Sequence, residues 1–271
     1  MIIDYREHQP FPPLDVFIHR MVYGNFPMPL PPEQLAPDSY IKLALILDGT
    51  PQYFDGAGAP MDWHDGFCGH VPPSKGIIAT SEGPVRCVMV NFYPSGFHQL
   101  FGLPVDRFTG RMVPPKEVLG TRIERLYADL HATKEPSDMF PLIEQCLMEL
   151  LADRPTAPRS TMQVVEQRIR ESKGTLANKE LAALVGLSER QLQRKALTEL
   201  GLSLKAFSSV VRFNHVYSYM QRTRKLDLDV ALACGFFDES HMMKEMTRYL
   251  GKTPKRFIGL VRPMVDVNLG H

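Results

Sequence analysis

The sequence is poor in the features that mark several classes of protein. Its four cysteines show no C-x-x-C spacing, so neither a disulfide framework nor a zinc site is predicted. There is no run of about 18 apolar residues, and the N-terminus lacks a basic segment followed by an apolar one. We therefore expect a cytoplasmic protein that does not interact with membranes.

Motifs of catalysis are also missing. The nine histidines include no H-x-H or H-x-x-H pair, which is the spacing expected of neighbouring metal ligands on a strand. A serine nucleophile elbow and a glycine-rich phosphate loop are absent as well. We predict no catalytic residues, no metal site, no other cofactor and no enzymatic activity.

The net charge of +1 hides opposite balances in the two halves of the chain. From Thr161 onward, 18 lysines and arginines stand against 11 aspartates and glutamates, a net charge of +7, whereas residues 1–160 carry −6. Phosphate contacts require a local excess of cations. On charge alone, a solvated basic surface is as good an explanation as a nucleic-acid surface, but either would belong to the C-terminal half.

Composition divides the chain into two predicted domains. Most prolines precede residue 116, and the short apolar runs between turn signals there predict strands over 40–47, 66–71, 76–80 and 85–92. Two amphipathic helices, over 119–130 and 143–151, are expected to close this domain by burying their apolar stripes in its core or in a dimer. Two prolines within 154–160 predict a linker. The fold class is therefore α+β, with a β-rich domain over 1–153 and an all-α domain over 161–271.

The all-α domain contains one pattern twice. Residues 181–201 and 230–251 each have an apolar residue and an alanine, then a turn glycine, an N-cap residue and an amphipathic stretch that ends at a glycine. This layout is typical of a helix-turn-helix, whose second helix protrudes far enough to enter a DNA major groove. A helix over 204–223, at about 1.5 Å per residue, is long enough to hold two such helices roughly one DNA turn, about 34 Å, apart.

The first unit has the more basic outer face. Ser188 and Gln191 form a capping box that fixes the start of the second helix. Leu192 and Ala196, four residues apart, are expected to face the core. The predicted DNA contacts of this helix are Ser188, Arg190, Gln193 and Arg194, of which arginine and glutamine are types that bind guanine, adenine or phosphate.

The second unit is less plainly basic. Asp238 is expected to cap its second helix, and Met242 and Met246 to face the core. The remaining residues give the predicted contacts Glu239, Ser240, His241, Lys244 and Arg248. We expect the first unit to specify the DNA sequence and the second mainly to anchor the protein.

The second unit also has the most specific signature. The run ALACGFFDESHM over 231–242, followed by Lys244, by Tyr249-Leu250-Gly251 and by Thr253-Pro254-Lys255-Arg256-Phe257, resembles the AraC-type transcription regulators. The resemblance covers about residues 161–257 and implies two helix-turn-helix units whose outer residues contact bases and phosphates. Ala196 stands where that family often has phenylalanine. Lys244 stands where arginine is usual, which exchanges a bidentate fork for a point charge.

The N-terminal domain resembles the cupin-like sensory domains that many such regulators carry, on the basis of residues 37–40 and 92–97. This resemblance implies an effector site at the mouth of a barrel. Side chains with a ring and a polar tip suit a small ligand, and an arginine suits an anionic one. Each of the candidates can equally be an ordinary residue of the core, a turn or a strand edge. These candidates are Tyr53, Trp63, His64, His70, Arg86 and Tyr93.

The sequence thus predicts a sequence-specific DNA-binding regulator of transcription that acts as an effector-responsive activator. Its expected partners are double-stranded DNA, a small-molecule effector and RNA polymerase, with a homodimer as an open alternative. Two other functions remain: a metal-dependent cupin-type enzyme domain fused to a DNA-binding module, and a DNA-binding protein that dimerises without a ligand.

Overall fold

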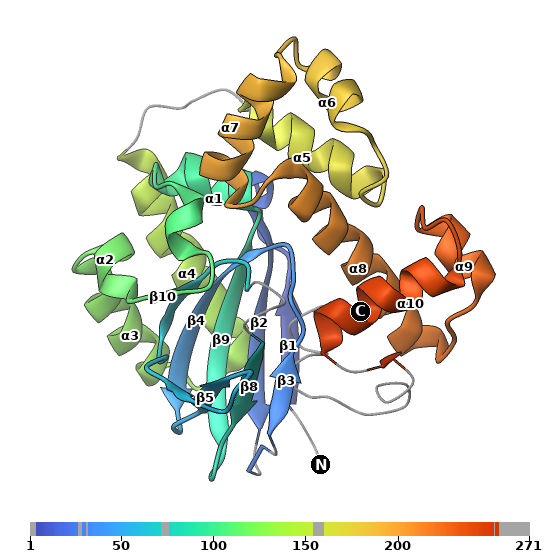
Figure 1. Cartoon of the computed structure of the whole chain (residues 1–271). Helices are drawn as coiled ribbons and strands as arrows, with labels where there is room; N and C mark the ends of the chain where they lie inside the picture. Colours follow the sequence, from blue (N-terminus) through green and yellow to red (C-terminus); the bar gives the residue numbers. More distant parts are fainter. Residues whose placement is uncertain are drawn as a thin grey trace.

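The computed structural model describes residues 4–26, 29–30, 32–71, 76–153, 160–251 and 253–254 (Figure 1). Within them, an N-terminal part made of antiparallel sheets with flanking helices is followed by a C-terminal part made only of helices. This confirms the predicted α+β class. None of the described helices is both long and apolar enough to cross a membrane. Most of the predicted linker, residues 154–159, lies outside the described residues, as does the end of the signature run, residues 255–257.

Two sheets form the N-terminal part. The larger has the order β1-β2-β9-β4-β7-β10, that is Asp4–His8, Ile18–Phe26, Val85–Phe92, Ile41–Asp48, Gly66–Cys68 and Met112–Val113. The smaller has the order β3-β8-β5-β6, that is Glu33–Leu35, Ile77–Thr80, Gln52–Asp55 and Pro60–Met61. All pairings are antiparallel, with Ile41 opposite Phe92 and Leu43 opposite Val90 in the centre of the larger sheet.

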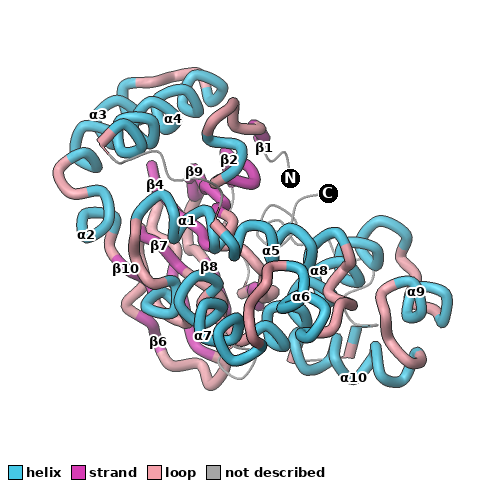
Figure 2. Tube along the Cα trace, turned by 90° about the horizontal axis from the view of Figure 1, so that it is seen from above, coloured by secondary structure: helices cyan, strands magenta, loops and turns pink. Residues whose placement is uncertain are grey.

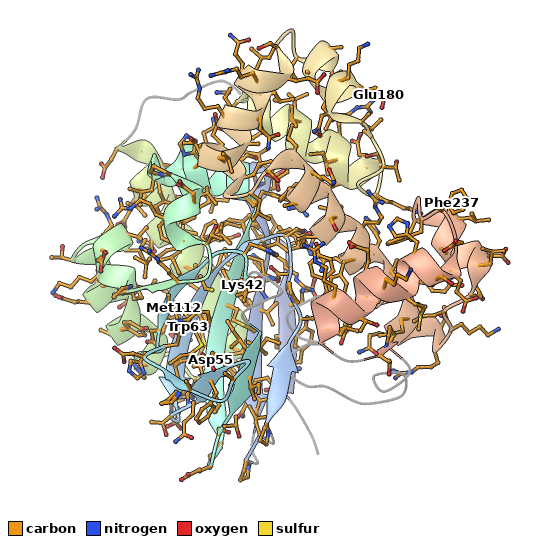
Figure 3. All side chains as sticks on the ribbon, in the orientation of Figure 1. Lys42, Asp55, Trp63, Met112, Glu180 and Phe237 are labelled. Atoms are coloured by element: carbon orange, nitrogen blue, oxygen red, sulfur yellow. The ribbon has the colours of Figure 1, made fainter. Side chains whose placement is uncertain are left out.

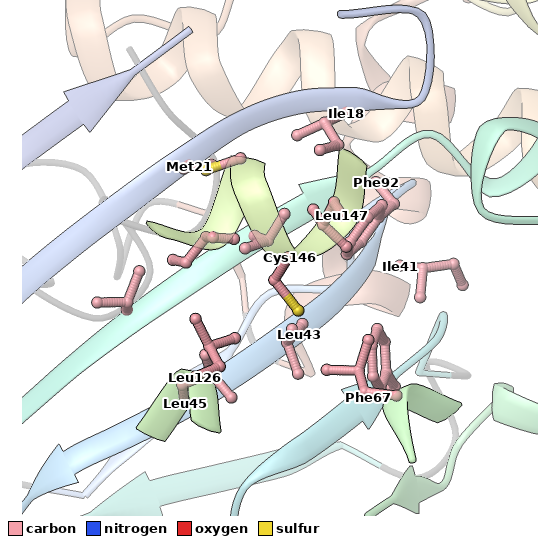
Figure 4. Close-up of a cluster of buried hydrophobic side chains, with 14 of the residues drawn as sticks. Ile18, Met21, Ile41, Leu43, Leu45, Phe67, Phe92, Leu126, Cys146 and Leu147 are labelled. Atoms are coloured by element: carbon pink, nitrogen blue, oxygen red, sulfur yellow. The ribbon is translucent and has the colours of Figure 1, made fainter. Parts of the chain in front are cut away.

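The main core lies between the larger sheet and its helices. Alternate residues of β4 are buried, as expected for a strand with one face in the core. Figure 4 shows side chains of β2 and β4 meeting Leu126 of α3 (Arg122–Ala132) and Cys146 and Leu147 of α4 (Pro136–Ala152). The apolar stripes of α3 and α4 therefore belong to the core of their own domain. The predicted helix over 119–130 is interrupted at Gly120-Thr121, which separate α2 (Pro115–Leu119) from α3.

Several elements of this domain do not follow from the sequence pattern. These are the strands β1, β2, β3, β5, β6 and β10, the helix α1 (Pro94–Phe101) and the single turns η1 (Leu14–Val16) and η2 (Val105–Phe108). The strand predicted over 66–71 ends at Cys68, because Gly69 already pairs with the carbonyl of Phe108 in η2.

In the described residues of the C-terminal part there are six helices: α5 (Thr161–Glu171), α6 (Asn178–Leu184), α7 (Glu189–Leu200), α8 (Leu204–Thr223), α9 (Leu228–Ala233) and α10 (Glu239–Leu250). Seen from above, they lie beside the sheets, on the side away from α3 and α4 (Figure 2). They contain two separate cores. Leu204, Phe207 and Val211 of α8 pack into the first, with α5, α6 and α7, whereas Phe213 and Val216 pack into the second, with α9 and α10.

Candidate DNA-binding interface

The first recognition helix, α7, begins at the predicted capping box. The Ser188 hydroxyl oxygen accepts a hydrogen bond from the Gln191 N–H (3.3 Å), and the Ser188 N–H donates to Gln191 Oε1 (3.0 Å). Leu192 and Ala196 are fully buried in the first core, as predicted. The start and the rotation of the helix are therefore set by local sequence.

The opposite face of α7 is open to solvent. Arg190 and Arg194 are exposed and Gln193 is half-buried. Within the described part of the chain neither guanidinium is held in an ion pair, whereas the neighbouring Lys195 pairs with Glu199 at 2.6 Å. Two unpaired arginines on one helix face can bind phosphate or the edge of guanine without first breaking an internal contact.

The second recognition helix, α10, is capped by Asp238, whose Oδ1 accepts the His241 N–H at 2.7 Å. Met242 and Met246 are fully buried, again as predicted. The predicted contact residues Glu239, Ser240, His241, Lys244 and Arg248 are all exposed. Two of them are partly engaged: the His241 ring meets the Phe236 ring edge-on at 5.2 Å between centroids, and Arg248 pairs with Glu245 at 3.3 Å.

An exposed aromatic residue beside α10 did not follow from the sequence argument. Phe237, immediately before the cap Asp238, is 87% exposed and points away from the domain (Figure 3). The sequence does contain a hint of it: the turn between the glycine and the N-cap residue is one residue longer in the second unit than in the first. On α7, Leu197 is also exposed, one turn beyond Arg194. Apolar groups on a recognition surface are suited to contact with thymine methyl groups.

The other end of α7 is docked on the N-terminal domain. The helix packs against α1 and η2, and the Thr109 hydroxyl donates a hydrogen bond to the Gly201 carbonyl at 3.0 Å. The sheet domain thus covers the C-terminal end of the recognition helix and leaves Arg190 and Arg194 exposed.

A buried cluster joins α5 to the sheet domain. Arg170 pairs with Glu166 at 2.6 Å and donates hydrogen bonds to the Ser39 hydroxyl and carbonyl, both at 2.8 Å. Its guanidinium lies 4.3 Å from the centre of the Tyr40 ring. Two cavities, of about 350 and 290 Å³, flank Arg170, and Tyr93 lines both of them.

The sequence-predicted effector residues fall into three groups. Tyr53 and Trp63 line a cavity of about 90 Å³ between the two sheets, with ring centroids 5.9 Å apart. His70 is buried nearby, with Nδ1 3.1 Å from the Asp38 carbonyl, and burial lowers its pKa. Tyr93 lies at the domain interface instead.

The other two candidates stand apart from this cavity. His64 is exposed, 3.1 Å from Asp62, and Arg86 interacts with Tyr23. Among the residues of the cavity that were not predicted, one is charged and stands out: Lys42, on the largely apolar face of β4, pairs with the buried Asp38 at the edge of the cavity. A lone lysine on an otherwise apolar strand was the available signal.

Comparison with known proteins adds a sequence match and a set of structural likenesses. Residues 181–259 match a family model described as a helix-turn-helix domain. The crystal structure of ToxT from Vibrio cholerae O395 is 8% identical, covers 94% of this chain and 96% of that chain, and has a TM-score of 0.49. ToxT from Vibrio cholerae strain SCE256 with a bound unsaturated fatty acid is 10% identical, with 95% and 94% coverage and a TM-score of 0.46.

The AraC-like transcriptional activator CuxR is 9% identical, with 72% and 79% coverage and a TM-score of 0.22. No curated protein matches the chain. The sequence match falls on the segment in which two capped recognition helices are carried by one long helix. Residues 181–259 are therefore a helix-turn-helix domain.

Proposed function

We propose that α7 and α10 enter two major grooves of one asymmetric DNA site, and that a small molecule in the cavity between the sheets changes the affinity for that site. The proposal of two grooves rests on one observation: α7 and α10 are both capped, both have an exposed outer face, and both are joined by the single 20-residue helix α8. A two-groove site is then about one DNA turn from centre to centre, roughly 34–36 Å.

The two helices have different roles in this proposal. Arg190, Gln193 and Arg194 give α7 three side chains of the types that read guanine and adenine. On α10, Lys244 supplies a point charge instead of a bidentate fork, so this helix holds the protein on the DNA more than it reads bases. Exposed Phe237 adds an apolar contact beside it.

Selection of bound sequences from random DNA with the full chain tests this function. The expected product is a site with one strongly conserved part, read by α7, and one weakly conserved part under α10. The double variant Arg190→Ala, Arg194→Ala should lose the strongly conserved part, whereas the double variant His241→Ala, Lys244→Ala should keep it. A single conserved part that survives both double variants would contradict the proposal. Tandem or inverted copies of the whole site in the selected DNA would indicate a homodimer.

The cavity between the sheets suits an apolar molecule with one polar group. Its lining includes Ile77, Met89 and Met112 around Trp63, with the Lys42–Asp38 pair at the edge. The adjoining segment contacts the DNA-binding domain, because Ala36 packs into its second core and the Pro37 carbonyl accepts a hydrogen bond from Asn214 Nδ2 at 2.9 Å. A ligand that moves this segment would shift α8, and through it the recognition helices.

Fluorescence gives a direct test of the effector site. Trp63 is the single tryptophan of the chain and is buried beside the cavity, so its emission reports on occupancy. Titration with a series of apolar carboxylic acids, alcohols and amines should give a saturable change for one class, together with a change in DNA affinity. A change in emission without any change in DNA affinity would contradict the coupling.

We further propose RNA polymerase as the partner through which DNA binding activates transcription. Transcription in vitro from a template that carries the selected site tests this proposal. An increase in transcript supports activation, and a decrease indicates repression.

A further inference from the structure

The two helix-turn-helix units have separate cores, so something must fix their relative orientation. Both cores contain residues of α8: Val211 belongs to the first and Phe213 to the second. The residue between them is Arg212. It lies on the stretch of α8 where residues of the two cores alternate, since Val210 also belongs to the second core, and its side chain is half-buried there.

Arg212 reaches backbone carbonyls of both units. Its Nη2 donates to the carbonyl of Gly174, in the loop between α5 and α6, at 2.8 Å. Its Nη1 lies 3.4 Å from the carbonyl of Gly235, in the turn of the second unit. The guanidinium also lies 5.3 Å from the centre of the Phe236 ring. One rigid, planar fork therefore connects the loop that leads into the first unit to the turn of the second.

The two connected segments also touch one another and α8. A Cβ on Gly235 would be 2.3 Å from Thr175 Cγ2, and a Cβ on Gly174 would be 2.2 Å from the Ser208 carbonyl oxygen. Both glycines have positive φ, which other residues adopt only with strain. On the same face of α8, Ser209 donates a hydrogen bond to Glu245 of α10 at 2.7 Å and accepts one from Tyr249. The second unit thus contacts α8 through its turn and through α10.

We propose that Arg212 is a positioning residue that sets the spacing between the two DNA half-sites. This inference rests on the two-groove function proposed above. Each base pair inserted between the half-sites moves the second groove by about 3.4 Å and rotates it by roughly 35°. A protein whose recognition helices are fixed by the Arg212 bridge tolerates little of this change, whereas one whose units move independently follows the second groove.

The test measures the affinity of the full chain for selected DNA in which the half-site separation is varied by one or two base pairs. The wild-type protein should lose roughly tenfold or more in affinity at a changed separation, because either the protein or the DNA must deform. We call the affinity at the selected separation divided by the affinity at a changed separation the spacing ratio. Arg212→Ala should reduce this ratio to about threefold or less while the preferred bases in each half-site stay the same. A folded Arg212→Ala variant with the wild-type ratio overturns the proposal.

Two further variants keep the result interpretable. Arg222→Ala removes the same charge from an exposed position of α8, so it should weaken binding equally at every separation. Arg212→Lys retains the charge and the aliphatic stem but lacks the fork, and it serves if Arg212→Ala does not fold. An intermediate ratio for the lysine variant supports the proposal, and a wild-type ratio overturns it.

Failure of the underlying function gives a different result. If the wild-type protein binds equally well at all separations, the two-groove function itself is wrong. The proposed role of Arg212 in spacing is then wrong as well. A measurement without DNA separates the two ideas. Spin labels at Leu184→Cys and Leu232→Cys, both on exposed positions of α6 and α9, should give a wider distance distribution in Arg212→Ala if this residue positions the units.

Discussion

The Glu166 carboxylate of α5 accepts two hydrogen bonds from Ser95, at the beginning of α1 in the other domain. One comes from the Ser95 N–H at 3.0 Å and one from its hydroxyl. Glu166 is 2% exposed and also pairs with Arg170. A carboxylate at a helix N-terminus is favoured by the helix dipole. A single buried acid therefore links the sheet domain, the first helix of the DNA-binding domain and the half-buried Arg170.

Glu166→Gln should destabilise the protein markedly. The substitution keeps the size of the side chain but leaves the half-buried Arg170 without its counter-charge, and removal of one partner of a fully buried pair costs up to about 3–5 kcal/mol. The free energy of unfolding in urea, followed by circular dichroism, measures this loss. The matched control is Glu171→Gln, which removes an exposed ion pair with Arg168 on the same helix and should leave stability nearly unchanged. Equal losses in the two variants would contradict the linking role of Glu166.

His19 should make stability depend on pH. Burial, with the nearby charges of Arg20 and Arg170, lowers the pKa of His19 from 6.5 to about 3. The unfolded chain therefore binds a proton at this residue before the folded chain does. The stabilisation is complete above about pH 6.5 and is lost as the pH falls toward 3, by about 1.4 kcal/mol per pH unit.

Urea unfolding of the wild type and of His19→Gln at pH 7, 6 and 5 tests this expectation. The variant should lose stability less steeply on acidification, because it has no imidazole to protonate in the unfolded state. His64→Gln, whose side chain is exposed at the edge of the sheet domain, should keep the wild-type slope. Parallel slopes for all three proteins would contradict the assigned role of His19.

Local signals explain why the DNA-binding half was predictable. Ser188 and Gln191 satisfy each other's backbone groups over three residues, and the buried faces of α7 and α10 repeat at helical spacing. Neither feature depends on distant parts of the chain. The strand Val85–Phe92 was predicted for the same kind of reason, since it is a mainly apolar run between two turn signals.

The sheet domain was harder to predict because its contacts are distant in sequence. The strand β2 shows no alternation, since nearly all of its residues are buried, including Arg20 at 2% exposure. The helix α1 begins with Pro94-Ser95, a sequence that reads equally well as a turn. Nothing local in the sequence brings Ser95 to Glu166, which is 71 residues away, or shows that His64 faces solvent while Trp63 faces the cavity.

Ala44→Leu should abolish the effector response without loss of DNA binding. Ala44 lines the cavity from β4, and three added carbon atoms take up much of a space of about 90 Å³. The expected result is that Trp63 emission no longer changes with the ligand class that affects the wild type, while affinity for the selected DNA in the absence of ligand stays the same. Ala132→Leu, an equal addition at an exposed position of α3, should respond as the wild type does. An unchanged response in Ala44→Leu would place the ligand elsewhere.

Arg194→Ala and Lys244→Ala should weaken DNA binding in different ways, because the two residues occupy equivalent positions on helices with different roles. Loss of a base-reading arginine should cost about 1–3 kcal/mol on the selected site and relax the preference at one base pair, with little effect on random DNA. Loss of a lysine that contacts phosphate should weaken binding to both DNAs alike and reduce the slope of log affinity against log salt by about 1. Affinities of both variants for selected and random DNA at several salt concentrations distinguish the two. A uniform loss for Arg194→Ala, or a change in base preference for Lys244→Ala, would reverse the assignment of α7 as the reading helix and α10 as the anchor.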